Sequence, residues 1–176
     1  LSMAARRWLR PLLLEGVQYI ASLLRLDDSR WVLWGRLREG KGFVAIYEPT
    51  LWEAPFLSTP ATRAFVGGAS EPERGIALVV GGDGVVVRVE GSAATSSAVE
   101  GAPDLTASAI DVLDREWVAS LGRLWVRDPV RDEAWRPVWT DAGWTTPFVT
   151  LMADAGMVVA MTVDGGIVEG RASWRG

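Results

Sequence analysis

Two adjacent carboxylate pairs are the residues in this sequence whose types could do the most chemistry. Asp27-Asp28 and Asp132-Glu133 could bind a hard cation, and pairs of acidic residues also perform glycoside hydrolysis. Neither pair has the spacing of an EF-hand loop, and a catalytic acid needs a carboxyl group held in an apolar pocket. Both pairs have the composition of turns. We therefore expect no catalytic residue, and a carboxylate-dependent glycoside hydrolase is kept as an alternative function.

The residue types that are missing exclude several classes of site. The chain has neither histidine nor cysteine. A Ser-His-Asp or Cys-His catalytic group is therefore excluded within these 176 residues, and so are disulfides and cysteine or histidine metal sites. We expect no metal and no cofactor. The absence of Asn and Cys fits a protein from a thermophile, although GC-rich codon usage explains it equally well.

Two glycine-rich loops could in principle hold phosphate. GGASEPERG (67–75) and VGGDGVVV (80–87) lack the Lys-Ser/Thr of a P-loop. The second loop lies between two apolar runs, whereas a dinucleotide-binding turn precedes a helix. We interpret it as the turn of a β-hairpin.

Tryptophan next to arginine is the most unusual pattern. Trp34 and Arg36, and likewise Trp125 and Arg127, are two positions apart and would share a face of a strand. Exposed pairs of this kind could stack single-stranded bases or sugars, or contact a protein partner. Buried pairs would be ordinary core packing. The candidate ligand- or partner-binding residues are Arg6, Arg7, Arg10, Trp34, Arg36, Trp125, Arg127, Trp174 and Arg175.

The N-terminal region predicts an amphipathic helix over about 11–26. Leu13, Val17, Ile20 and Leu24 recur at helical spacing, and Pro11 suits a first helical turn. Such a helix would pack on its own domain or, led by its arginines, dock on a partner or a membrane surface. No apolar stretch is long enough for a transmembrane helix, and we expect a cytoplasmic protein. The net charge of −4 provides no overall positive field for nucleic acid.

Similar blocks recur in the same order in both halves of the chain. ASLLRLDDSRWV (21–32) resembles ASAIDVLDREWV (107–118), and LWEAPFLS (51–58) resembles GWTTPFVT (143–150). GIALVVGGDGVVV (75–87) resembles GMVVAMTVDGGIV (156–168). These matches indicate an internal duplication.

The duplication defines the predicted fold. The predicted class is α+β, with two similar halves that each form a helix followed by a short antiparallel sheet, packed as one pseudo-symmetric body. The halves are residues 1–90 and 104–176, and the small, polar residues 91–103 form a flexible linker or loop. Asp104 or Thr106 would cap the second helix, with Leu105, Ala109, Ile110 and Leu113 on one side.

The Asp-Gly-Gly hairpins that follow Trp-led strands resemble those of propeller blades. The helix expected at the start of each half argues against a propeller, and two units cannot close a ring alone. No propeller function is carried over.

The predicted function is that of a non-catalytic binding or assembly subunit. It would engage protein partners, or itself, through the N-terminal helix and a Trp/Arg surface, and the unpaired sheet edges of each half favour an oligomer. A single-stranded nucleic-acid-binding protein is a second alternative. It predicts quenching of Trp fluorescence by oligonucleotide, with a strong salt dependence.

Overall fold

The structure, a computed structural model, describes residues 14–60, 62–131, 134–155 and 157–171. In these residues the chain forms fourteen β-strands and a single 3-10 turn at Gly82–Gly84, with no α-helix. The strands make four separate antiparallel sheets. The predicted α+β class is therefore wrong, and the described part of the protein is all-β.

Each sheet is a meander whose strands follow one another in chain order. Sheet 1 contains β1 (Val17–Arg25), β2 (Trp31–Leu37) and β3 (Gly42–Tyr47). Sheet 2 contains β4 (Phe65–Glu71), β5 (Ile76–Gly81), β6 (Val85–Glu90) and β7 (Ala93–Ala98). Sheet 3 contains β8 (Ala107–Ile110), β9 (Glu116–Ser120), β10 (Arg123–Arg127) and β11 (Arg136–Thr140). Sheet 4 contains β12 (Phe148–Asp154), β13 (Met157–Thr162) and β14 (Ile167–Arg171).

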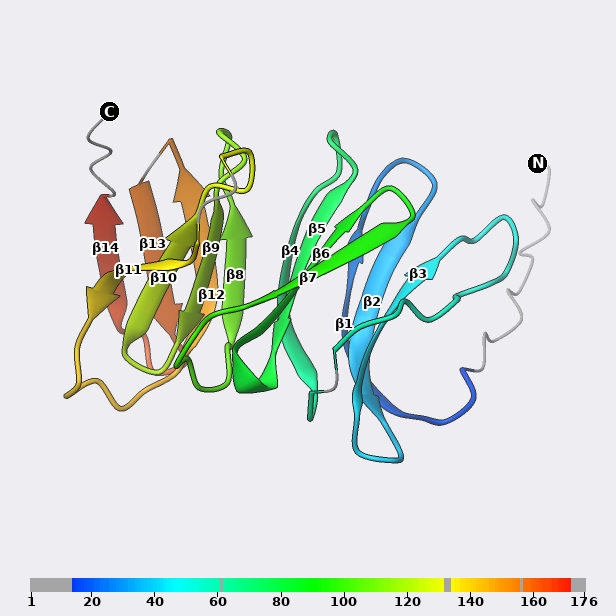
Figure 1. Cartoon of the computed structure of the whole chain (residues 1–176), viewed down its shortest axis with the longest axis horizontal. Coiled ribbons are helices and arrows are strands. Elements are labelled where there is room, and N and C mark those ends of the chain that lie inside the picture. The colour runs from blue at the N-terminus through cyan, green and yellow to red at the C-terminus, as the bar shows by residue number, and fades with distance from the viewer. Residues whose placement is uncertain (1–13, 61, 132–133, 156, 172–176) are drawn as a thin grey trace, which may run out of the picture.

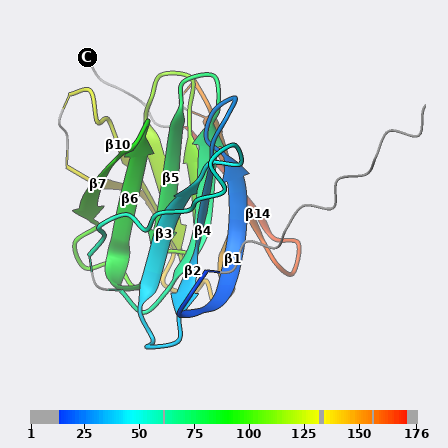
Figure 2. The ribbon, with the colours of Figure 1, turned by 90° about the vertical axis from the view of Figure 1, so that its right-hand side faces the viewer.

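The four sheets stand face to face in a row that follows the chain (Figure 1). The first strands make the closest contacts between sheets, because β1 packs on β4, β4 on β8 and β8 on β12. Figure 2 looks along this row from the end that sheet 1 forms. Sheets whose first strands lie together have the arrangement of β-propeller blades. Among the described residues, however, no comparable packing joins sheet 4 back to sheet 1, so the row stays open.

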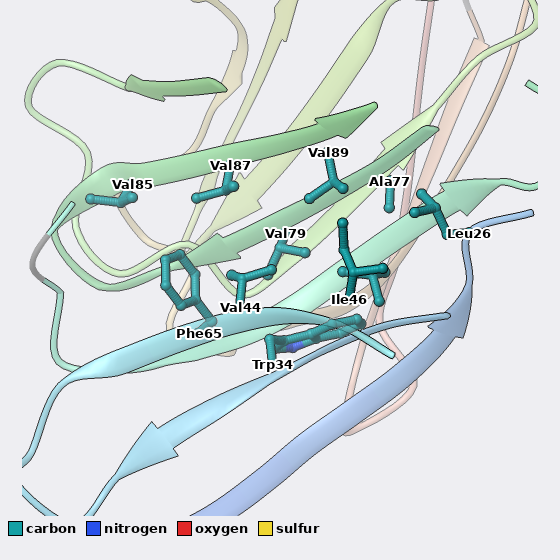
Figure 3. Packing of buried hydrophobic residues seen from close by; sticks show 11 residues of the cluster. Leu26, Trp34, Val44, Ile46, Phe65, Ala77, Val79, Val85, Val87 and Val89 are labelled. Atoms are coloured by element: carbon teal, nitrogen blue, oxygen red, sulfur yellow. The ribbon is translucent and has the colours of Figure 1, made fainter. Parts of the chain in front are cut away.

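Apolar side chains fill each of the three spaces between neighbouring sheets. Between sheets 1 and 2, Trp34 and Val44 meet Phe65, Val79 and three valines of β6, namely Val85, Val87 and Val89 (Figure 3). A second cluster joins sheets 2 and 3, and a third joins sheets 3 and 4. Because each inner sheet buries both of its faces, strands such as β5 and β8 are buried along their whole length.

The N-terminal helix expected over about 11–26 is contradicted by β1 over the described part of that range. Two β-bulges interrupt the pairing of β1 with β2. As a result, residues three apart on β1 pair with residues two apart on β2. The pairs are Val17 with Leu37, Ile20 with Gly35, and Leu23 with Leu33. Each bulge adds a residue and widens the spacing on one face to three. The bulged strand therefore imitates the period of a helix.

The second expected helix, after Asp104 or Thr106, is strand β8. This strand is sandwiched between neighbouring sheets, so that Ala107 and Ala109 face one core and Ile110 faces the other. A strand buried on both faces has no alternation that would distinguish it from a helix. The structure also differs at the expected linker, where residues 93–98 form β7 and pair with β6.

Four similar sheets are compatible with an internal repeat, but the two Trp-x-x-Pro-Phe words occupy different places. Phe148 begins β12 and is fully buried in the core. Phe56 lies outside the strands, bridges to Ala45 and is 46% exposed. The residue equivalent to Phe148 is instead Phe65. It is the first residue of β4, as Phe148 is the first residue of β12, and it is also fully buried.

Candidate functional site

The structure does not place the predicted Trp/Arg pairs on the surface as stacking platforms. Trp34 is 1% exposed and Trp125 is 4% exposed, so neither indole can receive a base or a sugar. Arg36 and Arg127 are half-buried. Arg6, Arg7, Arg10, Trp174 and Arg175 lie outside the described residues, and their roles stay predictions. The nucleic-acid alternative therefore loses the two tryptophans on which it chiefly depended.

Arg127 belongs instead to an ionic cluster that links sheet 2 to sheet 3. The Glu116 side chain is fully buried at the start of β9. Its Oε1 accepts a 2.9 Å hydrogen bond from Nη1 of Arg88 on β6, and its Oε2 accepts one of 2.9 Å from Nε of Arg127. Arg88 and Arg74 also pair with Asp114, in the turn that precedes β9. Burial lowers the pKa of Arg88, but the bonds to Glu116 and the charge of Asp114 outweigh that effect and raise it.

A hollow of about 450 Å³ opens beside this cluster. Its walls include Arg88, Asp114, Arg127 and the β7 residues Thr95 and Ser96. The carboxylates of Asp114 and Glu116 both accept hydrogen bonds from guanidinium groups. Neither sits in the apolar surroundings that a general acid requires. We interpret the cluster as a structural link between sheets rather than as the acid and base of a glycoside hydrolase.

The remaining carboxylate candidates also act in turns. Asp27 accepts hydrogen bonds from the backbone N–H groups of Ser29 and Arg30 and from the Arg30 side chain, so it shapes the β1–β2 turn. Asp132 and Glu133 lie outside the described residues. Among the described residues, no group of three or more acidic side chains is placed to hold a metal ion. The described residues also form no helix with the length and apolar character that crossing a membrane requires.

A second hollow, of about 340 Å³, lies where the first strands of the four sheets approach one another. Small and hydroxyl-bearing residues line it, including Ser22 from β1, Gly67 from β4, Ser108 from β8 and Thr150 from β12. None of the described residues that line it is charged. The buried indole Nε1 of Trp34, which also borders the hollow, has no hydrogen-bond partner among the described residues.

The open face of sheet 4 is the most distinctive surface of the described chain. One face of this sheet packs on sheet 3 through Phe148, Leu151, Val158 and Ala160, which are all buried. The opposite face, which we call the open face, consists of Thr150, Met152, Asp154, Met157, Val159, Met161, Ile167, Glu169 and Arg171, as the strand pairing places them. Ile167 is 60% exposed, Met152 54% and Met157 43%. A contiguous exposed group of apolar side chains on a sheet indicates an interaction surface.

Three of the four methionines of the chain lie on this open face. The methionine side chain is unbranched and polarizable, and it adapts to irregular partner surfaces. The charged residues Asp154, Glu169 and Arg171 stand at the border of the apolar group. An apolar centre with a charged rim is the usual anatomy of a protein–protein interface.

Sheet 1 ends the row on the other side, and its outward face is only partly covered. Leu33, Phe43 and Ala45 are buried there beneath side chains of the same chain, among them Ala54. Phe56 contacts Phe43 at a ring-centroid distance of 5.1 Å. On β1, Ile20 stays 50% exposed and Leu23 46% exposed. Both ends of the row therefore present apolar side chains on their first strands.

Sequence reasoning missed the open face because the signal that marks it is ambiguous. The run MVVAM in β13 alternates between a buried and an open face, but all five residues are apolar. The side chains alone cannot show which face a neighbouring sheet covers. A strand that is apolar on both sides is typical of a strand covered on both faces. The continuous apolar run of β13 was therefore the feature of the sequence that could have indicated a second contact surface.

Comparison with known proteins supports the fold and adds no function. No protein-family model matches the chain, and no curated protein matches it. The structure is similar to the crystal structure of the computationally designed Ika4 protein, with a TM-score of 0.67 and 16% sequence identity. The match covers 93% of this chain and 99% of that chain. At this identity the similarity shows the fold alone.

Proposed function

We propose that this protein is a non-catalytic assembly subunit that binds other polypeptides through the open face of sheet 4. The observation that carries the proposal is that this sheet buries one apolar face and leaves the other in solvent. Sheets 2 and 3 bury both faces inside the chain. Apolar sheet faces therefore form the three cores between neighbouring sheets, whereas the apolar open face of sheet 4 stays uncovered.

The energetics support a protein partner rather than a small ligand. Covering the open face would remove large parts of Met152, Met157 and Ile167 from water, and each fully buried side chain of this size contributes about 1.5–3 kcal/mol. Thr150 at one end of the face borders the hollow of about 340 Å³, but the exposed residues Met152, Met157 and Ile167 do not line that hollow or the one beside Glu116. A flat apolar sheet suits another sheet or a helix, because small molecules prefer concave sites.

Site-specific photo-crosslinking tests this proposal. A benzophenone amino acid replaces Met152 on the open face in one variant of the full chain and Val163 in another. Val163 is also apolar and is 73% exposed, but it lies in the turn after β13. In cells that produce the chain, we expect discrete covalent adducts from position 152 and few or none from position 163. Equal adduct formation at the two positions, or none at 152, would refute the proposed function.

A further inference from the structure

We infer that the polypeptide bound by the open face is a second copy of this chain, whose sheet 1 continues the row beyond sheet 4. This inference rests on the proposed function and specifies its partner. In each copy, the open face of sheet 4 would meet the outward face of sheet 1 of the other copy. Two such contacts would close a ring of eight sheets, which lies within the range known for propellers.

The order of faces within the chain supports a head-to-tail contact. Each sheet packs its forward face on the rear face of the sheet that follows, through the three apolar clusters between sheets. The uncovered forward face belongs to sheet 4. The outward rear face belongs to sheet 1, where residues of the same chain cover β2 and β3 and leave Ile20 and Leu23 of β1 exposed. These two faces have the same relative orientation as the pairs that already pack. A second copy therefore supplies the missing neighbour at both ends.

The first strands offer matching apolar residues for this contact. Inside the chain, the closest contacts between sheets join successive first strands. The corresponding contact between copies would join β12 to β1. Met152 is 54% exposed on β12, while Ile20 and Leu23 are 50% and 46% exposed on β1. One contact would cover the exposed apolar residues at both ends of the row.

The area of the faces favours a closed pair of chains over a single contact. A face of three strands and about five residues measures roughly 14 Å by 17 Å, from a strand spacing of about 4.8 Å and a rise of about 3.3 Å. One contact would then bury about 500 Å² in total, less than the roughly 1,000 Å² of a specific interface. When two chains close a ring, they form two such contacts in one association step, and the total buried area reaches about 1,000 Å². A contact of sheet 4 with sheet 4 would make one only.

The absence of native cysteine makes the inference directly testable. Leu23→Cys marks the outward face of sheet 1, and Met152→Cys marks the open face of sheet 4. The two purified variants are treated with a short bis-maleimide, separately and as an equimolar mixture. We expect a product of twice 19.1 kDa from the mixture and little from either variant alone. A product from Met152→Cys alone would show sheet 4 pairing with itself and would overturn the head-to-tail arrangement, while leaving the proposed function intact.

Light scattering after size-exclusion chromatography tests closure. The wild-type chain should have twice the monomer mass of 19.1 kDa. The double variant Leu23→Cys/Met152→Cys should crosslink to two chains and no further. A ladder of larger products would show an open filament and contradict ring closure.

Met152→Glu should raise the dissociation constant of the pair of chains at least tenfold, and the control Val163→Glu should not. A wild-type chain that stays monomeric would overturn the second copy as partner, even where photo-crosslinking at position 152 finds another protein.

Discussion

The indole ring of Trp34 lies directly against the backbone of Gly68, across the space between sheets 1 and 2. A Cβ atom at position 68 would stand 2.5 Å from Cη2 of Trp34 and 2.7 Å from its Cζ2. Trp34 therefore occupies the volume that any side chain at this position would need. The contact explains why an apolar strand carries glycine where it faces a neighbouring sheet.

Gly68→Ala should destabilise the protein by about 1–3 kcal/mol, because the added methyl group must displace a fully buried ring. Urea unfolding followed by circular dichroism measures the change. Gly170→Ala is the matched control on β14, because its Cβ would meet only Cγ1 of Val158 at an ordinary 3.5 Å. Equal losses in the two variants would show that alanine acts through strand conformation rather than through the Trp34 contact.

Glu116→Gln should cost about 3–5 kcal/mol of stability, because it leaves two guanidinium groups facing a buried neutral amide. Arg88 and Arg127 both depend on this carboxylate. Asp28→Asn is the control, since it disrupts the exposed pair with Arg25 and should change stability by less than about 1 kcal/mol. Thermal unfolding of both variants separates the two outcomes. A small loss for Glu116→Gln would mean that the cluster does not link sheets 2 and 3.

Stability should fall as the pH drops from about 4 towards 2, and Asp27 should account for part of the loss. Burial raises the pKa of Asp27, but hydrogen bonds from the Arg30 side chain and from the backbone of Ser29 and Arg30 outweigh it and lower the pKa from 3.8 to about 2. A carboxylate with a lowered folded-state pKa stabilises the fold above its unfolded pKa and loses that contribution as protons bind. The contribution is at most about 2 kcal/mol. Unfolding measured from pH 6 to pH 2 should show a weaker acid dependence for Asp27→Asn than for wild type.

Methionine oxidation should report whether the open face is covered. Met157 is 43% exposed in the single chain, and burial in an assembly would shield its sulfur from peroxide. We expect Met157 to oxidise several-fold more slowly in wild type than in Met152→Glu, as measured by peptide mass spectrometry. Identical rates at concentrations where the wild type is associated would place the contact on another surface.

The hairpin at 80–87 could be predicted because its signal is local. The antiparallel strands β5 and β6 pair on either side of this turn, as the two apolar runs around it indicate. The turn residues Asp83 and Gly84 adopt positive φ, as the Gly-Gly-Asp-Gly sequence requires. These features follow from the preferences of a few consecutive residues, so no knowledge of the neighbouring sheets was needed.

The helices were predicted wrongly because their segments take their form from contacts with distant residues. β1 acquires a spacing of three from its bulges against β2, and β8 is buried along its whole length because two sheets cover it. The same limit applies to Trp34 and Trp125, whose spacing from arginine is visible in the sequence but whose burial is not.

The sequence by itself determined where the chain turns, which runs can extend as strands, and which chemistry the missing histidine and cysteine exclude. Only the tertiary structure decided that the first strands of four sheets lie together, that Glu116 is enclosed by arginines, and that sheet 4 leaves an apolar face uncovered. The physical reason is that backbone preference acts over a few residues, whereas burial depends on which sheet stands opposite. That neighbour is brought into place by parts of the chain far away in sequence.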